Sequence, residues 1–199
     1  MSDLIVIDNG GGNVASVRFA LQRLGVTPVL TTEPDAIRGA RRVILPGVGT
    51  AGDAMRRLEA AGLDRLIPGL TQPVLGICLG MQLLFEASEE GTTRCLGILK
   101  GVARRIPDAP GRPVPHTGWN RLEPARPSAL LEGIEPGAFA YFVHSYALPV
   151  GEHTIASTHY AGPFTAVASR GNFHGVQWHP ERSASTGARL LANFLNLDA

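Results

Sequence analysis

Short apolar runs alternate with amphipathic segments along the first half of the chain. Residues 4–8 (LIVID), 27–32 (TPVLTT), 41–47 (RRVILPG) and 73–78 (PVLGIC) are runs typical of buried strands. Between such runs, apolar residues recur at helical spacing, as in the segment 51–62 (AGDAMRRLEAAG). This alternation predicts βαβ units and therefore an open, mostly parallel α/β sheet with helices on both faces, a flavodoxin-like arrangement.

The first of these units is a strand, a glycine-rich turn and a helix. The turn DNGGGN (8–13) precedes apolar residues at helical spacing from Val14 to Leu24, and Gly25 marks the expected end of the helix. The turn lacks the third spaced glycine of a dinucleotide fingerprint and the Gly-Lys-Ser/Thr of a P-loop. We therefore expect a helix capped by Asn13, not a nucleotide site.

The pattern changes after about residue 95. Short β-type runs separated by Pro and Gly predict hairpins and crossings that extend or flank the first sheet, before a closing helix at about 185–195. The proline-rich stretch 105–118 is predicted to be a surface loop, because neither side of it has an obvious core of its own. The expected organisation is a single domain over residues 1–199 with a strand-rich second half.

Composition narrows the possible environments and partners. The chain has 199 residues, 44% of them hydrophobic, which is enough for a substantial core. Its formal net charge of +1 gives no reason to expect a nucleic acid or a membrane as partner. The start MSDLIVID does not resemble a signal peptide, and no apolar stretch approaches the roughly 20 residues that cross a bilayer. We expect a cytoplasmic protein with reduced thiols.

Cys78 lies between two glycines at a predicted junction of strand and helix. The sequence GICLG has the form of a nucleophile elbow, in which Gly76 and Gly80 avoid crowding between strand and helix. The positive end of the following helix favours the thiolate. The same spacing also arises by chance around buried structural cysteines, so the motif indicates chemistry only together with a base. Cys95 has no such context and is predicted to be structural.

The sequence GVQWHPE provides a candidate base. Proline pushes the preceding residue, His179, toward extended geometry. Residues two apart in an extended segment share a face, so Glu181 is expected to accept the imidazole N–H. Together with Cys78 these residues would form a triad for acyl transfer. Without the elbow, a strand ending in an exposed turn would explain the pattern equally well.

A second glycine-rich turn offers donors for an oxyanion hole. In ILPGVGTAG (44–52) a predicted strand runs into a helix through a glycine-rich turn. The N–H of Leu79, which follows the nucleophile, and an N–H of Val48 or Gly49 would stabilise the oxyanion of acyl transfer. Glycines on both sides of Val48 would let its peptide plane flip at low cost.

With PGVG, GICLGMQLLFE and HPE in this order, the chain resembles the class I (triad) glutamine amidotransferases over nearly its whole length. Within this class it is most similar to the glutaminase subunits that serve imidazole glycerol phosphate synthase in histidine biosynthesis, through PGVG, CLGMQLLFEASEEG, HTGWN and YFVHSY. The resemblance implies that Cys78 attacks the side-chain amide of glutamine, that His179 moves protons and that Glu181 orients His179. It implies no metal or organic cofactor.

The resemblance also implies how substrate and partner are bound. The residues expected to bind glutamine are Gly47, Gln82, Glu90, His144, Ser145 and Tyr146. Ammonia would pass to a (β/α)8 cyclase subunit in a heterodimer that makes imidazole glycerol phosphate and an aminoimidazole carboxamide ribotide (AICAR). The residues expected to face this partner are Asn13, Trp119, Tyr141 and Arg182.

Three other functions fit parts of the pattern. A glutaminase that serves pyridoxal phosphate synthase usually has Gly-Gly-Glu-Ser where this chain has PGVG. A cysteine hydrolase that acts on γ-glutamyl or peptide bonds would need the same elbow. A non-catalytic binding subunit would have no physical reason to keep Cys78, His179 and Glu181 together.

Overall fold

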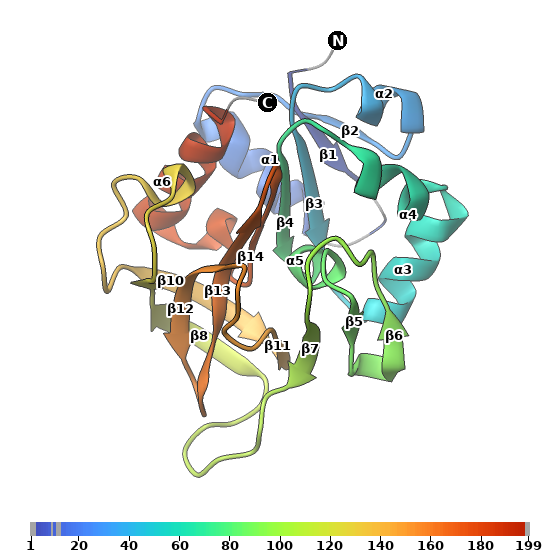
Figure 1. The fold of residues 1–199 in the computed structure, drawn as a ribbon. Coiled ribbons are helices and arrows are strands. Elements are labelled where there is room, and N and C mark those ends of the chain that lie inside the picture. Colours follow the sequence, from blue (N-terminus) through green and yellow to red (C-terminus); the bar gives the residue numbers. More distant parts are fainter. Residues whose placement is uncertain (1–2, 9, 11–12, 198–199) are drawn as a thin grey trace.

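A computed structural model describes residues 3–8, 10 and 13–197, and its centre is an eight-stranded sheet in the order β2–β1–β3–β4–β14–β13–β12–β9 (Figure 1). The first five strands run parallel: β1 (Ile5–Ile7), β2 (Val29–Thr31), β3 (Val43–Gly47), β4 (Val74–Cys78) and β14 (Phe173–Val176). The others extend the sheet in antiparallel fashion: β13 (Pro163–Arg170), β12 (Thr154–His159) and β9 (Glu123–Pro124). The predicted fold class is confirmed.

Helices cover both faces of this sheet, as predicted (Figure 1). One face carries α1 (Val14–Arg23) and α6 (Ala184–Leu195), and the other carries α2 (Pro34–Arg38), α3 (Ala51–Ala60), α4 (Leu63–Leu66) and α5 (Leu79–Leu83). Side chains alternate between the faces along each strand. In β3, Ile44 joins the core beneath α1 and α6, while Val43 and Leu45 join the core beneath α3. Single 3-10 turns are η1 (Ile67–Gly69), η2 (Glu90–Thr92), η3 (Ala129–Leu131) and η4 (Pro180–Arg182).

Two smaller sheets complete the second half of the chain. One is an antiparallel ribbon of β8 (His116–Arg121) and β10 (Phe139–His144), and the other has the order β11 (Tyr146–Ala147), β7 (Val102–Arg105), β5 (Ala87–Ser88) and β6 (Thr93–Arg94). Along β10, the residues Ala140, Phe142 and His144 are buried, whereas Phe139 and Val143 are exposed. The ribbon therefore has one face in the core and one face in solvent.

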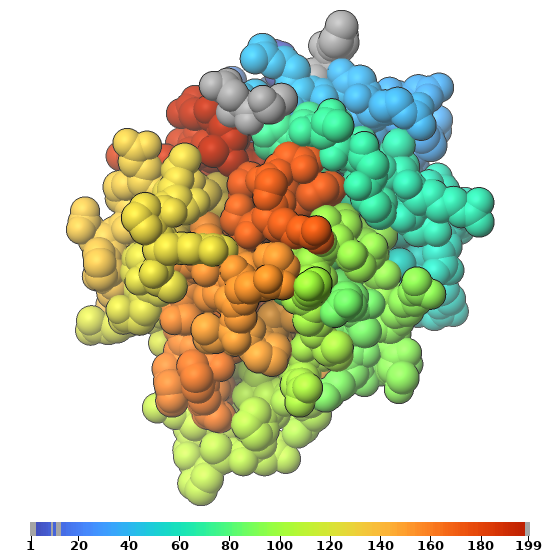
Figure 2. Space-filling model, in the orientation of Figure 1, coloured from blue at the N-terminus to red at the C-terminus, as the bar shows by residue number. Residues whose placement is uncertain are grey.

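The proline-rich loop projects from the end of the molecule opposite the termini (Figures 1 and 2). It spans residues 106–115, so the prediction of a surface loop is confirmed, but both ends of the stretch 105–118 belong to strands. The hydroxyl of Tyr160 donates a 2.7 Å hydrogen bond to the carbonyl of Pro113 and ties the loop to the body. Among the helices within the described ranges, none is long and apolar enough to cross a membrane.

The predicted cap of the first helix is wrong in its chemistry. Of the turn 8–13, residues 9, 11 and 12 lie outside the described residues. Asn13 occupies the N-cap position of α1, but its side chain makes no capping hydrogen bond. The amide of Asn13 instead donates to the carboxylate of Glu181. A charged acceptor makes a stronger hydrogen bond than a neutral one. The carboxylate of Glu181 therefore determines how the side chain of Asn13 is oriented.

Candidate active site

Cys78 lies at the junction of β4 and α5 in a backbone conformation that L-residues rarely adopt, with φ 54° and ψ −112°. The two flanking glycines make this turn possible. A Cβ on Gly76 would lie 2.6 Å from the carbonyl oxygen of Gly80, and one on Gly80 would overlap the carbonyl of Leu45. The nucleophile elbow predicted from GICLG is therefore present, for the steric reason expected.

The glycine-rich turn after β3 lies directly beside the elbow. Gly47 is in register with Cys78 across the parallel β3–β4 pair. A Cβ on Gly47 would lie only 2.6 Å from the backbone nitrogen of Gly80, so glycine is needed for this close approach. Gly49 has φ 92°, a conformation that glycine adopts without strain. Val48, Gly49 and Leu79, the predicted oxyanion donors, all line the cavity that contains Cys78.

His179 and Glu181 form a buried hydrogen-bonded pair. The Nδ1 of His179 lies 2.7 Å from the Oε1 of Glu181, and the two side chains are 5% and 0% exposed. His179 itself is extended, as predicted, with φ −101° and ψ 95°, but the prediction is wrong beyond it, because Pro180–Arg182 forms a 3-10 turn in which the Arg182 N–H donates to the His179 carbonyl. The turn folds Glu181 back beneath the imidazole, so the two side chains meet by a different route.

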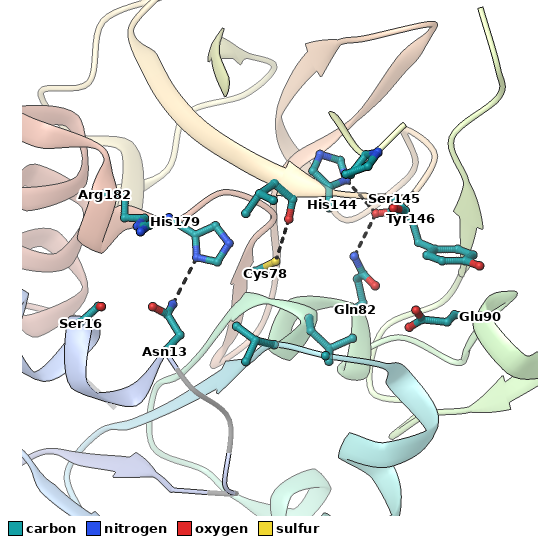
Figure 3. Close-up of a pocket in the computed structure, with 15 residues that line it drawn as sticks. Asn13, Ser16, Cys78, Gln82, Glu90, His144, Ser145, Tyr146, His179 and Arg182 are labelled. Atoms are coloured by element: carbon teal, nitrogen blue, oxygen red, sulfur yellow. Dashed lines mark hydrogen bonds between the residues drawn. The ribbon is translucent and has the colours of Figure 1, made fainter. Parts of the chain in front are cut away.

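The surroundings of His179 favour its protonated form. Burial lowers the pKa of His179, but the Cys78 sulfur and the Glu181 carboxylate raise it more strongly, to about 10 against an ordinary 6.5. The Nε2 of the ring is buried and has no hydrogen-bond partner within the described part of the chain. The ring lies between Asn13 and Cys78 (Figure 3), so His179 holds a proton next to the sulfur.

Asn13 is a third polar side chain in contact with this pair. Its Nδ2 donates a 2.6 Å hydrogen bond to the Oε1 of Glu181 and lies 3.2 Å from the Nδ1 of His179. Carboxylate oxygens only accept, which fixes the amide nitrogen of Asn13 on this side. The sequence predicted Asn13 as a helix cap and as a partner residue, and it gave no signal for this contact.

A second polar group lies on the other side of the sulfur. The Nε2 of Gln82 donates to the carbonyl of Tyr146 and to the Oε1 of Gln177, both at 2.9 Å. The Nε2 of Gln177 lies 3.8 Å from the sulfur of Cys78, and the thiol is 3.8 Å from the carbonyl of Val143 (Figure 3). Sequence reasoning missed Gln177, because the residues of this group are far apart in the chain.

The remaining predicted substrate residues contribute in different ways. His144 is buried and its Nδ1 lies 2.8 Å from the carbonyl of Tyr146, so the protein itself uses this ring nitrogen. Ser145 and Tyr146 are half-buried beside the cavity. The carboxylate of Glu90 accepts a 2.7 Å hydrogen bond from the N–H of Ala51 at the start of α3. Each of these residues is therefore held by backbone contacts or packing at the edge of the site.

These side chains surround a cavity of about 490 Å³, a size that suits a small molecule. The predicted site residues that line it are Asn13, Val48, Gly49, Cys78, Leu79, Gln82, Glu90, His144, Ser145, Tyr146, His179 and Arg182. Ser16, Pro115 and Val143 also line it, although no local pattern singled them out. Gly47, Trp119, Tyr141 and Glu181 lie behind or beside the cavity, not in its lining.

The predicted partner residues of the β8–β10 ribbon lie together at the edge of the site. Trp119 is 53% exposed, and its ring meets that of Tyr141 edge-on at 5.9 Å. The guanidinium of Arg182 lies over the Tyr141 ring as well, 5.7 Å from its centre. Because Arg182 also lines the cavity, this aromatic cluster is continuous with the site.

Cys95 lies outside the lining of the cavity that contains Cys78. It is buried, and burial raises the pKa of its thiol to about 11. A thiol that stays protonated is a poor nucleophile. Cys95 fits the structural role predicted for it.

The fold and the site together agree with comparisons against known proteins. The chain belongs to the class-I glutamine amidotransferases, since the sequence model of the family described as "Glutamine amidotransferase class-I" matches residues 5–197. Among solved structures, one titled a glutamine amidotransferase has a TM-score of 0.75 at 21% identity, covering 98% of this chain and 97% of its own. A structure titled a putative GMP synthase protein, from Thermoplasma acidophilum, has a TM-score of 0.74 at 17% identity, covering 98% of this chain and 92% of its own. These two structures support the fold.

Curated relatives specify the branch of the class. The chain is 55% identical over 199 residues, all of both chains, to a protein of Xylella fastidiosa (strain Temecula1). It is 54% identical over 197 residues to a protein of Xanthomonas axonopodis pv. citri, covering 99% and 98% of the two chains. Both are named imidazole glycerol phosphate synthase subunit HisH. At this identity over the whole length, the chain falls within the HisH family.

Proposed function

We propose that this chain hydrolyses glutamine to glutamate and ammonia through a thioester on Cys78, and that it delivers the ammonia to a (β/α)8 cyclase subunit of imidazole glycerol phosphate synthase. The observation that carries this proposal is that Cys78, at a strained nucleophile elbow, shares one cavity with His179, whose ring is bonded from behind by the buried Glu181. The names of the HisH relatives support the assignment to histidine biosynthesis.

In the first half-reaction the sulfur of Cys78 attacks the side-chain amide carbon of glutamine. A carbon–sulfur bond forms and the carbonyl electrons move onto oxygen, where the N–H groups of Leu79 and of Val48 or Gly49 stabilise the charge. His179 transfers the proton on Nε2 to the amide nitrogen. The carbon–nitrogen bond then breaks, ammonia leaves and a thioester remains.

In the second half-reaction the neutral ring of His179 takes a proton from water. The resulting hydroxide attacks the thioester, the carbon–sulfur bond breaks and glutamate leaves, which restores the thiolate and the imidazolium. The hydrogen bond from Nδ1 to Glu181 keeps the ring in the tautomer that leaves Nε2 free for these transfers. Glu181 therefore acts on the reaction through His179.

Glutamine binding is assigned to the opposite part of the cavity. Gln82 uses both amide hydrogens on the protein, so its Oε1 is left to accept a hydrogen bond from the substrate. Glu90, at the same end of the cavity, supplies a negative charge for the α-amino group of glutamine. The other proposed contacts come from Gly47 and from the segment His144, Ser145 and Tyr146.

The partner is proposed to bind over the β8–β10 ribbon and the cavity edge. Exposed aromatic residues with a neighbouring arginine are typical anchors of protein interfaces. Trp119, Tyr141 and Arg182 form such a cluster, and Asn13 lines the same cavity on the side of Arg182 (Figure 3). Ammonia released at Cys78 would then enter the cyclase, which would make imidazole glycerol phosphate and AICAR, without passing through solvent.

The test is glutamate release from glutamine, measured for the chain alone and then with the cyclase and its phosphoribosyl ligand. We expect slow release alone, a strong increase in the mixture, and loss of release by at least about 1000-fold in Cys78→Ser. The increase is expected because binding of the partner would complete the oxyanion hole by a flip of the Val48 peptide plane, and equal release with and without the cyclase would contradict this dependence. Release that survives in Cys78→Ser would contradict the thioester mechanism.

A further inference from the structure

Gln177 is a buried amide in direct contact with the sulfur of Cys78. It follows β14, its side chain is fully buried, and it lies behind the cavity and not in its lining. Substrate therefore does not reach it. Its Oε1 accepts a hydrogen bond from Gln82 at 2.9 Å, and its Nε2 lies 3.8 Å from the sulfur.

We infer that Gln177 is a positioning residue that holds both the Cys78 sulfur and the Gln82 amide in the orientation the reaction needs. The inference deepens the proposed function and rests on it, since it takes Cys78 as the nucleophile. An amide suits this role because one end accepts and the other donates, so a single side chain couples a donor on Gln82 with an acceptor sulfur.

The orientation of this amide is fixed by hydrogen bonds that start from a backbone carbonyl. The oxygen of Tyr146 only accepts, so the Nε2 of Gln82 is a donor to it. The second hydrogen on that nitrogen points to the Oε1 of Gln177. The Nε2 of Gln177 must then face the sulfur. The oxygen of Gln82 points away from Tyr146, on the side of Glu90 (Figure 3).

The carbonyl of Tyr146 is also bonded by His144, which is in turn bonded by His116. His144 donates from Nδ1 to the oxygen of Tyr146 at 2.8 Å, so its Nε2 accepts from the Nδ1 of His116 at 3.0 Å. The Nε2 of His116 in turn accepts from the amide of Asn120 at 3.3 Å. Every group in this series has one defined direction, which makes reversal of the Gln82 and Gln177 amides costly.

The sulfur has a different neighbour for each of its protonation states. The thiol S–H donates to the carbonyl of Val143, whereas the thiolate accepts from the N–H of Gln177. Hydrogen bonds to a charged acceptor are stronger than those to a neutral one. Gln177 therefore gives the attacking sulfur a hydrogen-bond donor, which the carbonyl of Val143 cannot provide.

Two substitutions separate the two contacts of Gln177. Gln177→Glu keeps the length and the acceptor for Gln82, but it puts a carboxylate oxygen in place of the donor to sulfur and adds a negative charge that repels the thiolate. Gln177→Met has a similar length and removes both. The matched control is Gln72→Met, because Gln72 is also a buried glutamine whose Nε2 donates a 2.9 Å hydrogen bond, to the carbonyl of Ile37.

The readouts are the rate of alkylation of Cys78 by iodoacetamide on the isolated chain, located by peptide mapping, and kcat and KM for glutamate release with the cyclase present. For Gln177→Glu we expect alkylation and kcat to fall about tenfold or more, with KM within about threefold of wild type. For Gln177→Met we expect kcat to fall and KM to rise. Gln72→Met should leave the alkylation rate, kcat and KM unchanged per folded molecule.

Three outcomes would overturn the inference. One is a folded Gln177→Glu variant with wild-type alkylation and kcat. A second is a fall in kcat with unchanged alkylation, which would remove the role at the sulfur. A third is an equal loss of alkylation and kcat in Gln72→Met, which would mean that the loss of any buried amide has this effect. If wild-type chain shows neither alkylation at Cys78 nor glutamate release, the proposed function fails and the inference fails with it.

Discussion

The amide of Asn13 donates a 2.6 Å hydrogen bond to the carboxylate of Glu181, across 168 positions of sequence. It links the first turn of α1 to the 3-10 turn that carries Glu181 and follows His179 directly. Asn13 thus supports the residue that orients His179, in a place where a helix cap was expected. The position of α1 is thereby tied to the orientation of the imidazole.

Removal of this amide should weaken catalysis. In Asn13→Ala we expect kcat for glutamate release to fall about tenfold, because Glu181 loses a charge-assisted hydrogen bond. Asn13→Asp should cost more, since two adjacent carboxylates repel each other and one of them takes up a proton. The measurement is kcat between pH 6 and 9. Asn193→Ala is the control, because the amide of Asn193 bonds the carbonyls of Leu130 and Glu132, which do not line the cavity. Equal kcat in Asn13→Ala and the control would refute the link.

The elbow glycines should be needed for folding itself. In Gly80→Ala the new methyl group would overlap the carbonyl of Leu45, so we expect the free energy of unfolding in urea to fall by at least about 2 kcal/mol. Gly69→Ala is the matched control, because no atom lies within 4 Å of the added Cβ. Its effect should stay within about 1 kcal/mol. A Gly80→Ala variant as stable as the control would contradict the crowding at the elbow.

Stability should fall on both sides of about pH 6.5. Burial lowers the pKa of His116 to about 4, of His144 to about 3 and of His174 to about 4, each from an ordinary 6.5. The unfolded chain therefore takes up protons first as pH falls from 6.5 toward 4, and stability is lost there. His179, with a pKa raised to about 10, adds stability below pH 6.5 that is lost as pH rises toward 10.

The measurement is the free energy of unfolding at pH 4.5, 6.5 and 9. Each unit of pKa difference corresponds to roughly 1.4 kcal/mol, so the acid loss should amount to several kcal/mol. Cys78→Ala removes a group that raises the pKa of His179 and should reduce the alkaline loss. A stability that does not change between pH 4.5 and 6.5 would contradict the neutral, buried state of these histidines.

The aromatic cluster should govern association with the cyclase. Trp119→Ala removes the most exposed large anchor of the ribbon, and we expect the dissociation constant of the complex to rise about 30-fold or more. Val150→Ala serves as the control, because Val150 is similarly exposed, at 50%, and lies outside the ribbon. Titration calorimetry provides the measurement. Equal affinity in the two variants would place the partner elsewhere on the surface.

Features set by neighbouring residues were predictable from the sequence. The alternation of strand and helix up to Cys78 predicted four of the five parallel strands, all but β14, since each unit carries its own apolar pattern and turn signal. The elbow was predictable because its glycines flank the cysteine directly. The contact between His179 and Glu181 was predicted from a backbone that is correct at His179 and wrong at Pro180–Arg182, since a two-residue spacing brings side chains together in this tight turn as well.

Features set by packing between distant segments were not predictable. Gln177 lies in the same motif as His179, yet its importance depends on Gln82 and Cys78, which are brought beside it by β4 and α5. The hydrogen-bond directions of His116 and His144 follow from a carbonyl on β11. Local patterns also gave no sign that β8 and β10 form a ribbon of their own. These contacts form only when the two small sheets pack against the eight-stranded sheet.

The β8–β10 ribbon is a single layer of sheet where it borders the site. In β10 the side chains of Tyr141 and Val143 lie on the outer face, while the carbonyl of Val143 lies 3.8 Å from the sulfur of Cys78. A protein docked on the outer face would therefore contact Val143, which also lines the cavity. Docking could therefore change the shape of the cavity without any rearrangement of the core. For the same reason, a substitution on the outer face of β10 would also alter the lining of the cavity.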